Sequence, residues 1–369
     1  MTVPFLNPAA QFAELRDSLL AAVENSLATG HYILGPNVTA FEVEAAAYLG
    51  VRFAVGVNSG SDALTLALKA LGIGPGDEVV TSPFTYIAPA EAIHQVGAQI
   101  VFADIDPMTF CLDPADVARR ISPRTRAVIP VHLFGQATDL DALSGAIGER
   151  NIAVVEDCAQ SIGAERQGRR VGGSGRIGCF SFYPTKNLGA AGDGGLCVTD
   201  DEATAKTLRM LRIHGIEKRY HHQLHGFNSR LDDIQAAILR VKLPHLDAWN
   251  ARRQEIAARY TSGLANLPLQ VPVTGLGNTH IYHVYAVLTD HRDALQTHLA
   301  ANGVPTLIYY PLPLHRQEVY ADQGWRAGDF PVAEATSARI LPLPMYPELS
   351  DEQVDWVIAK VREFFGKGD

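Results

Sequence analysis

Seven short apolar segments between residues 53 and 199 constrain the fold more than any other feature of this sequence. Each is rich in β-branched residues and is bounded by turn formers, as buried strands are. Helical patterns lie between the first five segments, so we expect an α/β fold whose mainly parallel sheet carries helices on both faces. The expected strands cover residues 53–57, 78–82, 99–103, 127–131, 152–155, 178–182 and 195–199.

Two of the intervening helical patterns have recognisable ends. Between residues 61 and 71, leucines recur at i, i+4 and i+7 and so share one helix face. Ser61 is the expected N-cap of this helix, and Gly72 is its expected terminator. Asp113 followed by Pro114 predicts another N-cap, with proline at the first helical position.

The pattern changes after residue 199. One helix is expected over residues 201–213, and a long helical stretch over 229–267 is interrupted at Pro244. Ser229 to Asp232 predicts a capping box at the start of that stretch. A strand near 284–288 and helices near 292–302 and 351–365 follow. We therefore expect a large domain over residues 1–249 and a smaller C-terminal α+β domain over 250–369.

Composition and charge exclude several classes of function. The chain has 369 residues, 47% of them apolar, and a formal net charge of −9. Because no Lys/Arg cluster interleaved with aromatic residues occurs, we expect no nucleic-acid partner. The N-terminal residues lack the pattern of a signal peptide and no run is long enough to span a membrane, so we expect a cytoplasmic protein with no membrane partner.

The cysteines and histidines do not predict a metal site. No C-x-x-C pair occurs, so the cysteine spacing encodes neither a zinc site nor an iron–sulfur cluster. His221, His222 and His225 are close in sequence but have no acidic partner at ligand spacing, and we expect no metal there. The four cysteines, which we expect to stay reduced, are Cys111, Cys158, Cys179 and Cys197.

Lys186 and Asp157 carry the strongest chemical signal. Lys186 stands in the run SFYPTKNLG at residues 181–189, which is followed by GDGG at 192–195. Asp157 lies 29 positions earlier, where a buried strand ends in EDCAQ at residues 156–160. Pyridoxal phosphate needs a lysine to bind its aldehyde and an anion to keep its ring nitrogen protonated. The pair therefore suits that cofactor.

Each of these two residues also has a simpler reading. Lys186 could be a strand-end lysine whose side chain extends to water, although the apolar strand before it and the glycine-rich turn after it would solvate an ammonium poorly. Asp157 could be a helix cap or a turn former. A carboxylate at the carboxyl end of a buried strand nevertheless lies where open α/β sheets bind their ligands.

A phosphate would need a cradle, and residues 58–62 suit that role. Gly60 lets the backbone approach closely, and the helix expected to begin near Ser61 would offer unpaired N–H groups. Ser181 could add a hydroxyl group, and Tyr86 could stack on the cofactor ring. Such turns are common in every α/β protein, a core role for Ser181 is about equally likely, and aromatic residues after strands are more often packing residues, so this signal alone is weak.

Four motifs in order resemble the DegT/DnrJ/EryC1/StrS family of pyridoxal-phosphate sugar aminotransferases, from about residue 4 to the C-terminus. They are NSGSDAL at 58–64, EDCAQ at 156–160, the run at 181–195 around Lys186, and GFNSRLD at 226–232 continuing to QAA at 235–237. The resemblance implies the aspartate aminotransferase-like fold, fold type I, with a seven-stranded mixed sheet and a smaller C-terminal α+β domain. It also implies a homodimer with shared active sites.

The resemblance also implies roles for single residues. Lys186 would bind the cofactor covalently, and Asp157 would pair with its ring nitrogen. Tyr183, Tyr310 and His315 would bind the substrate. The implied cofactor-binding residues are Gly60, Ser61, Asp62, Tyr86, Asp157, Gln160, Ser181 and Lys186, with Asn228 reaching the phosphate from the partner subunit. From the residues alone, Asn228 is equally well a turn residue and residues 309–315 a Pro-rich surface loop.

The predicted reaction is transfer of an amino group, from L-glutamate as donor, to the ketone of a keto sugar linked to UDP or dTDP. Relatives that remove a hydroxyl group carry histidine in place of Lys186, which disfavours a dehydratase. The sequence after Lys186 is closer to that of enzymes acting on 3-keto sugars than to that of 4-keto-sugar aminotransferases. A non-catalytic regulator that binds pyridoxal phosphate is the alternative from another functional class.

Overall fold

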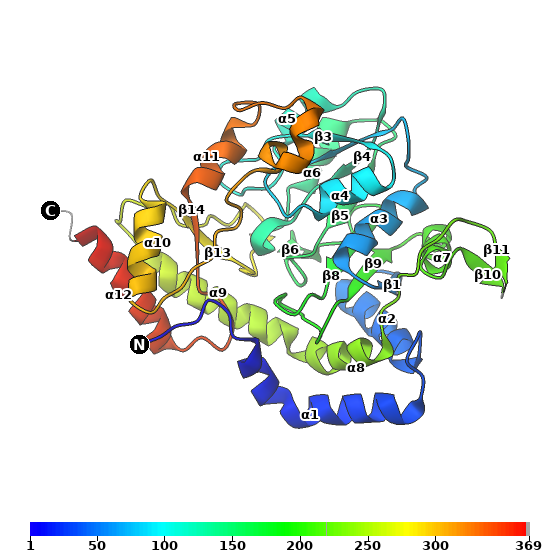
Figure 1. Ribbon diagram of the computed structural model, residues 1–369, viewed down its shortest axis with the longest axis horizontal. Helices are drawn as coiled ribbons and strands as arrows, with labels where there is room; N and C mark the ends of the chain where they lie inside the picture. Colours follow the sequence, from blue (N-terminus) through cyan, green and yellow to red (C-terminus); the bar gives the residue numbers. More distant parts are fainter. Residues whose placement is uncertain (219, 367–369) are drawn as a thin grey trace.

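The computed structural model describes residues 1–218 and 220–366 (Figure 1). Its central feature is a seven-stranded sheet in the order β1-β9-β8-β5-β4-β2-β3. β9 runs antiparallel to β1 and β8, and all other neighbours are parallel. The strands are β1 (Phe53–Val57), β2 (Glu78–Thr81), β3 (Gln99–Phe102), β4 (Thr125–Ile129), β5 (Ala153–Asp157), β8 (Ile177–Ser181) and β9 (Gly195–Thr199).

The predicted α/β fold and its mixed, mainly parallel seven-stranded sheet are confirmed. Every expected apolar segment forms one of these strands, with ends that shift by at most two residues. β5 extends beyond the expected apolar run because its backbone continues to pair with β8, where Asp157 lies opposite Cys179. Asp157 is therefore the last residue of a central strand rather than part of the following turn.

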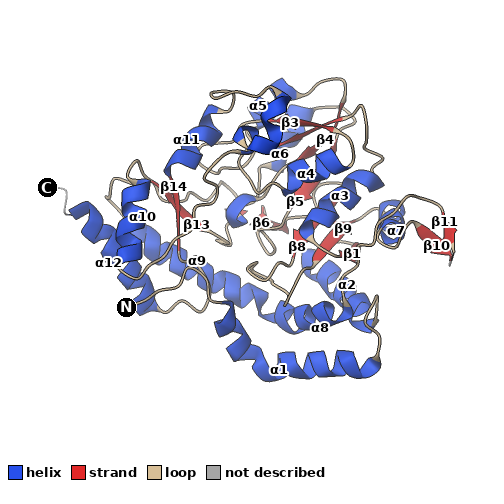
Figure 2. Ribbon diagram, in the orientation of Figure 1, coloured by secondary structure: helices blue, strands red, loops and turns tan. Residues whose placement is uncertain are grey.

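Helices cover both faces of the sheet, as Figure 2 shows. Alternate strand residues face opposite layers, so Val79 packs toward α3, α4 and α7 while Val80 packs toward α5 and α6. α2 and α8 cover β1, β8 and β9 on this second face. The helices are α2 (Pro36–Leu49), α3 (Gly60–Ala70), α4 (Ala88–Gln95), α5 (Pro114–Arg120), α6 (Leu140–Ile147), α7 (Glu202–Leu211) and α8 (Asp233–Lys242).

Two of the predicted helix starts are wrong. α3 begins at Gly60 with Ser59 as N-cap, whose Oγ accepts the Asp62 N–H at 3.1 Å, so Ser61 already lies inside the helix. The capping box over residues 229–232 does not form. Ser229 Oγ instead accepts the Asn58 N–H at 3.2 Å, because the chain before α8 packs against the turn that follows β1. The expected N-cap Asp113 does cap α5.

The C-terminal part of the chain has a core of its own. β13 (Tyr285–Leu288) and β14 (Ile340–Leu343) pair antiparallel, and α9, α10 and α12 surround them. The division into domains after residue 249 stays a prediction, and α9 continues through that position. The helices of this part of the chain are α9 (Leu246–Gly263), α10 (Arg292–Ala301), α11 (Pro331–Arg339) and α12 (Asp351–Gly366).

Several small elements lie outside the main sheet. β6 (Glu165–Arg166), β7 (Arg169–Arg170) and β12 (Asn278–Thr279) form a three-stranded sheet, and β10 (Ile216–Lys218) and β11 (His221–His222) form a hairpin that projects from the body of the molecule (Figure 1). Within the described parts of the chain, no helix combines the length and apolar character needed to cross a bilayer.

One buried carboxylate ties three helices together. α1 (Pro8–Thr29) lies along α8, as Figure 1 shows. Asp233, at the start of α8, is fully buried. It accepts hydrogen bonds from Ser26 Oγ on α1 at 3.0 Å and from the Asn37 and Val38 N–H groups of α2 at 2.9 and 3.2 Å. α2 has no capping side chain of its own, so Asp233 caps it from a distant part of the chain.

We expect Asp233→Ala to lower the free energy of unfolding by about 3 kcal/mol, because four donors lose a charged acceptor: Ser26 Oγ, the Asn37 and Val38 N–H groups, and Asn37 Nδ2. Asp232 provides a matched control because its side chain makes no capping hydrogen bond. Asp232→Ala should cost less than about 1 kcal/mol. Urea unfolding followed by circular dichroism measures both values, and equal effects of the two substitutions would contradict this role of Asp233.

Candidate active site

A cavity of about 450 Å³ opens at the carboxyl ends of the parallel strands. Open α/β sheets bind their ligands at this edge. The turns after β1, β2, β4, β5 and β8 all contribute to its wall. Nine residues predicted from the sequence line the cavity: Gly60, Ser61, Tyr86, Asp157, Gln160, Ser181, Tyr183, Lys186 and Tyr310.

Lys186 and Asp157 face the same cavity, and burial shifts the pKa of each. Burial lowers the pKa of the Lys186 ammonium from 10.5 to about 8, although the Asp157 carboxylate opposes this shift. Burial raises the pKa of the Asp157 carboxyl group, and the Ala159 N–H and the Lys186 charge limit the rise. Asp157 is 4% exposed, and its Oδ1 accepts the Ala159 N–H at 3.0 Å. A buried carboxylate of this kind gains stability from a cationic partner.

The turn between β1 and α3 suits a phosphate group. α3 begins at Gly60, so the first N–H groups of the helix lack intrahelical acceptors and the helix dipole favours an anion. A Cβ atom on Gly60 would lie 2.6 Å from Ser181 Cβ, so only glycine lets the turn approach β8 this closely. The Asp62 N–H is already bonded to Ser59, which leaves the Gly60 and Ser61 N–H groups as the candidate donors.

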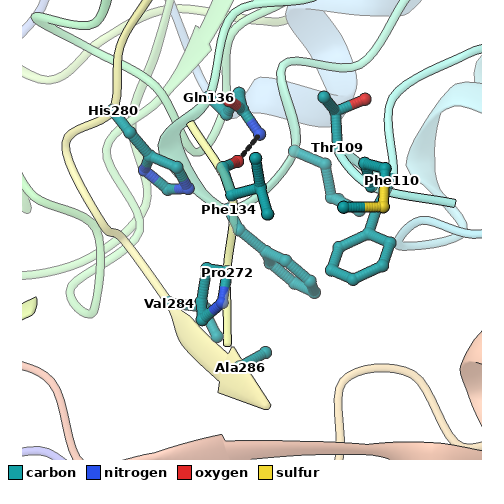
Figure 3. Close-up of a pocket in the computed structure, with 11 residues that line it drawn as sticks. Thr109, Phe110, Phe134, Gln136, Pro272, His280, Val284 and Ala286 are labelled. Atoms are coloured by element: carbon teal, nitrogen blue, oxygen red, sulfur yellow. Dashed lines mark hydrogen bonds between the residues drawn. The ribbon is translucent and has the colours of Figure 1, made fainter. Parts of the chain in front are cut away.

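The side chain of Gln160 is held in a fixed orientation. Its Oε1 accepts the Phe134 N–H at 2.8 Å, and its Nε2 donates to the Tyr310 hydroxyl at 2.9 Å. The rings of Tyr310 and Phe134 stack at 6.5 Å. Figure 3 shows Phe134 from the side of a second, smaller pocket, where Gln136 Nε2 donates to the Val273 carbonyl at 3.1 Å. The loop after β4 is therefore anchored on both sides.

The lysine loop is held from two directions. The Lys186 N–H donates to the Tyr183 carbonyl at 2.8 Å, which makes a tight turn after β8. From α8, Lys242 Nζ donates to the Gly189 carbonyl at 2.8 Å, and Gln235 Oε1 accepts the Ala191 N–H at 2.8 Å. The backbone that follows the amine is thus braced by the helix that also carries Asp233.

Glu156 forms a buried hydrogen-bond network directly beside the site. It is fully buried and accepts hydrogen bonds from His132 Nε2 at 2.8 Å and from the Gly172 and Ser174 N–H groups at 2.8 and 2.9 Å. These bonds outweigh burial and lower the pKa of its carboxyl group. His132 Nδ1 accepts the Thr138 N–H at 2.9 Å. Hydrogen bonds therefore engage both ring nitrogens of His132 and both carboxylate oxygens of Glu156.

Three predicted site residues do not line the cavity. Asp62 lies within the first turn of α3 and contributes its N–H to the N-cap. Asn228 is exposed and pairs with Ile213 through the backbone, so its predicted contact with a partner subunit stays a prediction. His315 is buried, with its Nε2 2.9 Å from a Glu334 carboxylate oxygen and its ring packed against Phe330, which fits a structural role in that loop.

The cavity also contains residues that the sequence did not single out. Thr185 and Asp193 lie within the run at residues 181–195 quoted for the resemblance, and Tyr309 begins the Pro-rich segment 309–315, so these three could have been proposed from the sequence. His283 carries no such signal, because it follows a loop almost one hundred positions after Lys186. The further lining residues with polar groups are Ser59, Thr85, Thr185, Asp193, His283 and Tyr309.

Comparison with known proteins identifies the family. The model of the DegT/DnrJ/EryC1/StrS aminotransferase family matches residues 13–362. The dTDP-3-amino-3,4,6-trideoxy-alpha-D-glucose transaminase of Streptomyces venezuelae is 47% identical over 100% of this chain and 97% of its own length. A pleiotropic regulatory protein of Geobacillus stearothermophilus is 43% identical over 99% of each chain.

A solved structure has nearly the same fold. The crystal structure of DesV from S. venezuelae, in complex with a ketimine intermediate, has a TM-score of 0.98 and 47% identity, and the match covers 100% of both chains. The predicted fold type I and the predicted cofactor, pyridoxal phosphate, are confirmed. The chain belongs to the DegT/DnrJ/EryC1/StrS aminotransferase family, whose aminotransferases depend on pyridoxal phosphate.

Proposed function

We propose that this enzyme transfers the amino group of L-glutamate to the C3 ketone of a keto sugar linked to dTDP or UDP. The observation that carries the proposal is the placement of Lys186 and Asp157 in one cavity, beside a helix N-terminus suited to a phosphate. Pyridoxal phosphate held by these residues would supply an aldehyde to carry the amino group and a ring to act as electron sink.

The cavity residues have distinct tasks in this proposal. Lys186 holds the cofactor and, once released, moves a proton as a free amine, for which a pKa of about 8 is well matched. Asp157 supplies the negative charge that keeps the ring nitrogen protonated. Gly60, Ser61 and Ser181 hold the phosphate group. The Gln160 side chain, which is held by its hydrogen bond to Tyr310, would orient the cofactor ring.

The amino-acid donor and the sugar substrate would enter over exposed aromatic residues. Tyr86 and Tyr183 are 60% and 53% exposed, and both line the cavity. Tyr86 is assigned to stacking on the cofactor ring and Tyr183 and Tyr310 to the sugar. Completion of the site by Asn228 of the partner subunit, and with it a homodimer in the cytoplasm, belongs to the same proposal.

Two observations support C3 as the position of amination. The run after Lys186, through GDGG at residues 192–195, resembles that of enzymes acting on 3-keto sugars. The S. venezuelae relative is named for a 3-amino sugar product. The name of the G. stearothermophilus relative raises the alternative of a regulator. An intact Lys186 with a lowered pKa favours turnover over mere retention of the cofactor.

We expect L-glutamate to abolish the visible absorbance of the cofactor-loaded protein and to yield 2-oxoglutarate. A dTDP- or UDP-linked 3-keto sugar should then restore the absorbance and appear as the 3-amino sugar by mass spectrometry. Lys186→Ala should remove both the absorbance change and turnover, because no other lysine lines the cavity among the described residues. Lys69→Ala, in the last turn of α3, is the matched control.

The outcomes separate the alternatives. Amination of a 4-keto sugar in preference to the 3-keto sugar would overturn the C3 assignment but leave the aminotransferase. A cofactor-loaded protein that shows no change with L-glutamate or with other amino acids would instead support the regulator.

We expect the rate at which the cofactor-free protein binds pyridoxal phosphate to rise with pH. The pKa of Lys186 is lowered to about 8, so below that pH the amine is mainly protonated and above it mainly neutral and nucleophilic. The rate should increase about tenfold from pH 7 to pH 9. Stopped-flow absorbance measures it, and a rate still rising steeply above pH 9 would show that Lys186 keeps an ordinary pKa.

Gly60→Ala should weaken binding of pyridoxal phosphate by at least about tenfold, because the new methyl group would collide with Ser181 Cβ and push the turn away from β8. Gly145→Ala is the matched control, since a Cβ atom there meets no atom within 4 Å. Titration of the cofactor-free variants, followed by absorbance, gives both affinities. Equal affinities would show that this turn does not hold the phosphate.

A further inference from the structure

The residue after Lys186 belongs to a buried hydrogen-bond chain that ends on a histidine of the cavity. Asn187 is 4% exposed, and its Nδ2 donates to Asn250 Oδ1 at 2.8 Å and to the Ile281 carbonyl at 3.4 Å. Asn250 Nδ2 donates in turn to the Ile162 carbonyl at 3.2 Å. At the other end, His283 Nδ1 lies 3.0 Å from Asn187 Oδ1.

The two backbone carbonyls determine the direction of every bond in this chain. A carbonyl oxygen can only accept, so the amide NH₂ of Asn250 must point at Ile162 and its oxygen must accept from Asn187. The NH₂ of Asn187 also serves the Ile281 carbonyl, which leaves its oxygen as the acceptor for His283. The proton of His283 is therefore on Nδ1.

The position of the Asn250 amide depends on a glycine that packs against it. Gly163 has a φ of +90°, and a Cβ atom there would lie 2.6 Å from Asn250 Nδ2. Any other residue would displace the amide from the Ile162 carbonyl. Asn250 is 4% exposed, so its amide has no access to water as a substitute partner.

The surroundings of His283 keep its ring neutral. Burial, the Lys186 ammonium and the buried Arg253 guanidinium all act in the same direction and hold the pKa of the imidazole well below its usual range. Lys186 and Arg253 are the charged groups that act on it. With Nδ1 protonated, Nε2 carries a free lone pair, and no group in residues 1–218 and 220–366 forms a hydrogen bond with it.

We propose that His283 binds the substrate as a hydrogen-bond acceptor, with Nε2 receiving a hydroxyl group of the sugar. His283 lines the same cavity as Lys186, Tyr183 and Tyr310, so a ligand bound there can reach it. A histidine locked in this state accepts a hydroxyl donor but offers no proton to the ketone. That the hydrogen-bond donor is a sugar hydroxyl rests on the proposed function, whereas the protonation state of the His283 imidazole does not.

NMR spectroscopy of ¹⁵N-histidine-labelled protein tests the state of the ring directly. The signals of His283 are identified by their loss in His283→Asn. We expect Nδ1 to be protonated and Nε2 unprotonated, with no change between about pH 6 and about pH 8. A proton on Nε2, or titration to the imidazolium within this range, would overturn the proposal without involving any substrate.

Two substitutions separate the acceptor from the buried chain. His283→Asn places an NH₂ group near the Nδ1 position, so it keeps the bond to Asn187 and removes Nε2. We expect it to raise KM for the keto sugar about tenfold, as the loss of one hydrogen bond does, and to change the half-reaction with L-glutamate by less than that. His283→Gln places an amide near Nε2 and loses the bond to Asn187, so it should slow both half-reactions.

The outcomes remain distinguishable. If His283→Asn slows the glutamate half-reaction as much as the sugar half-reaction, Nε2 serves the Lys186 amine and the assignment to the sugar is wrong. If the unsubstituted enzyme aminates no keto sugar, the proposed function fails, and the NMR signals still decide the state of His283.

Discussion

The active-site edge of the sheet depends on the buried carboxylate of Glu156. It joins His132 from the segment after β4 to the turn at residues 172–175 that precedes β8, while its own backbone belongs to β5. Because its donors are a histidine ring and backbone N–H groups, the charge is satisfied without water. Successive strand residues face opposite sides, so holding Glu156 on one side directs Asp157 to the other, into the cavity.

A second set of contacts, made by two helices, holds the loop that carries Lys186. Gln235, Lys242 and Asn250 reach the lysine loop from α8 and α9. α8 is itself fastened to α1 and α2 through Asp233. The amine therefore projects from a turn that these contacts hold in place. The conformational entropy of this turn is lost when the protein folds and not when a ligand binds. The same bracing continues through Asn187 to His283, which links the position of the lysine to the tautomer of the histidine.

How far the sequence predicts this protein depends on how local each signal is. The strands were predictable because β-branched apolar runs and turn residues are local. Their ends moved by up to two residues because backbone pairing sets them: β5 continues to Asp157, whereas β4 already stops at Ile129. The start of α3 was placed two residues late because Ser59 and Ser61 both suit an N-cap by type, and in the structure Ser59 accepts the Asp62 N–H. The capping box failed because Ser229 bonds to Asn58, 171 positions away.

The sequence by itself determined the α/β sheet, the association of Lys186 with a strand-end carboxylate, and the cofactor class, since each rests on short local motifs that can be recognised one at a time. The tertiary structure alone decided that His283 meets Asn187 across 96 positions and that Asp233 caps α2 across 196. It also placed His315 in a structural contact away from the cavity. Hydrogen bonds between distant residues depend on how whole elements pack, and no local pattern of residues encodes that packing.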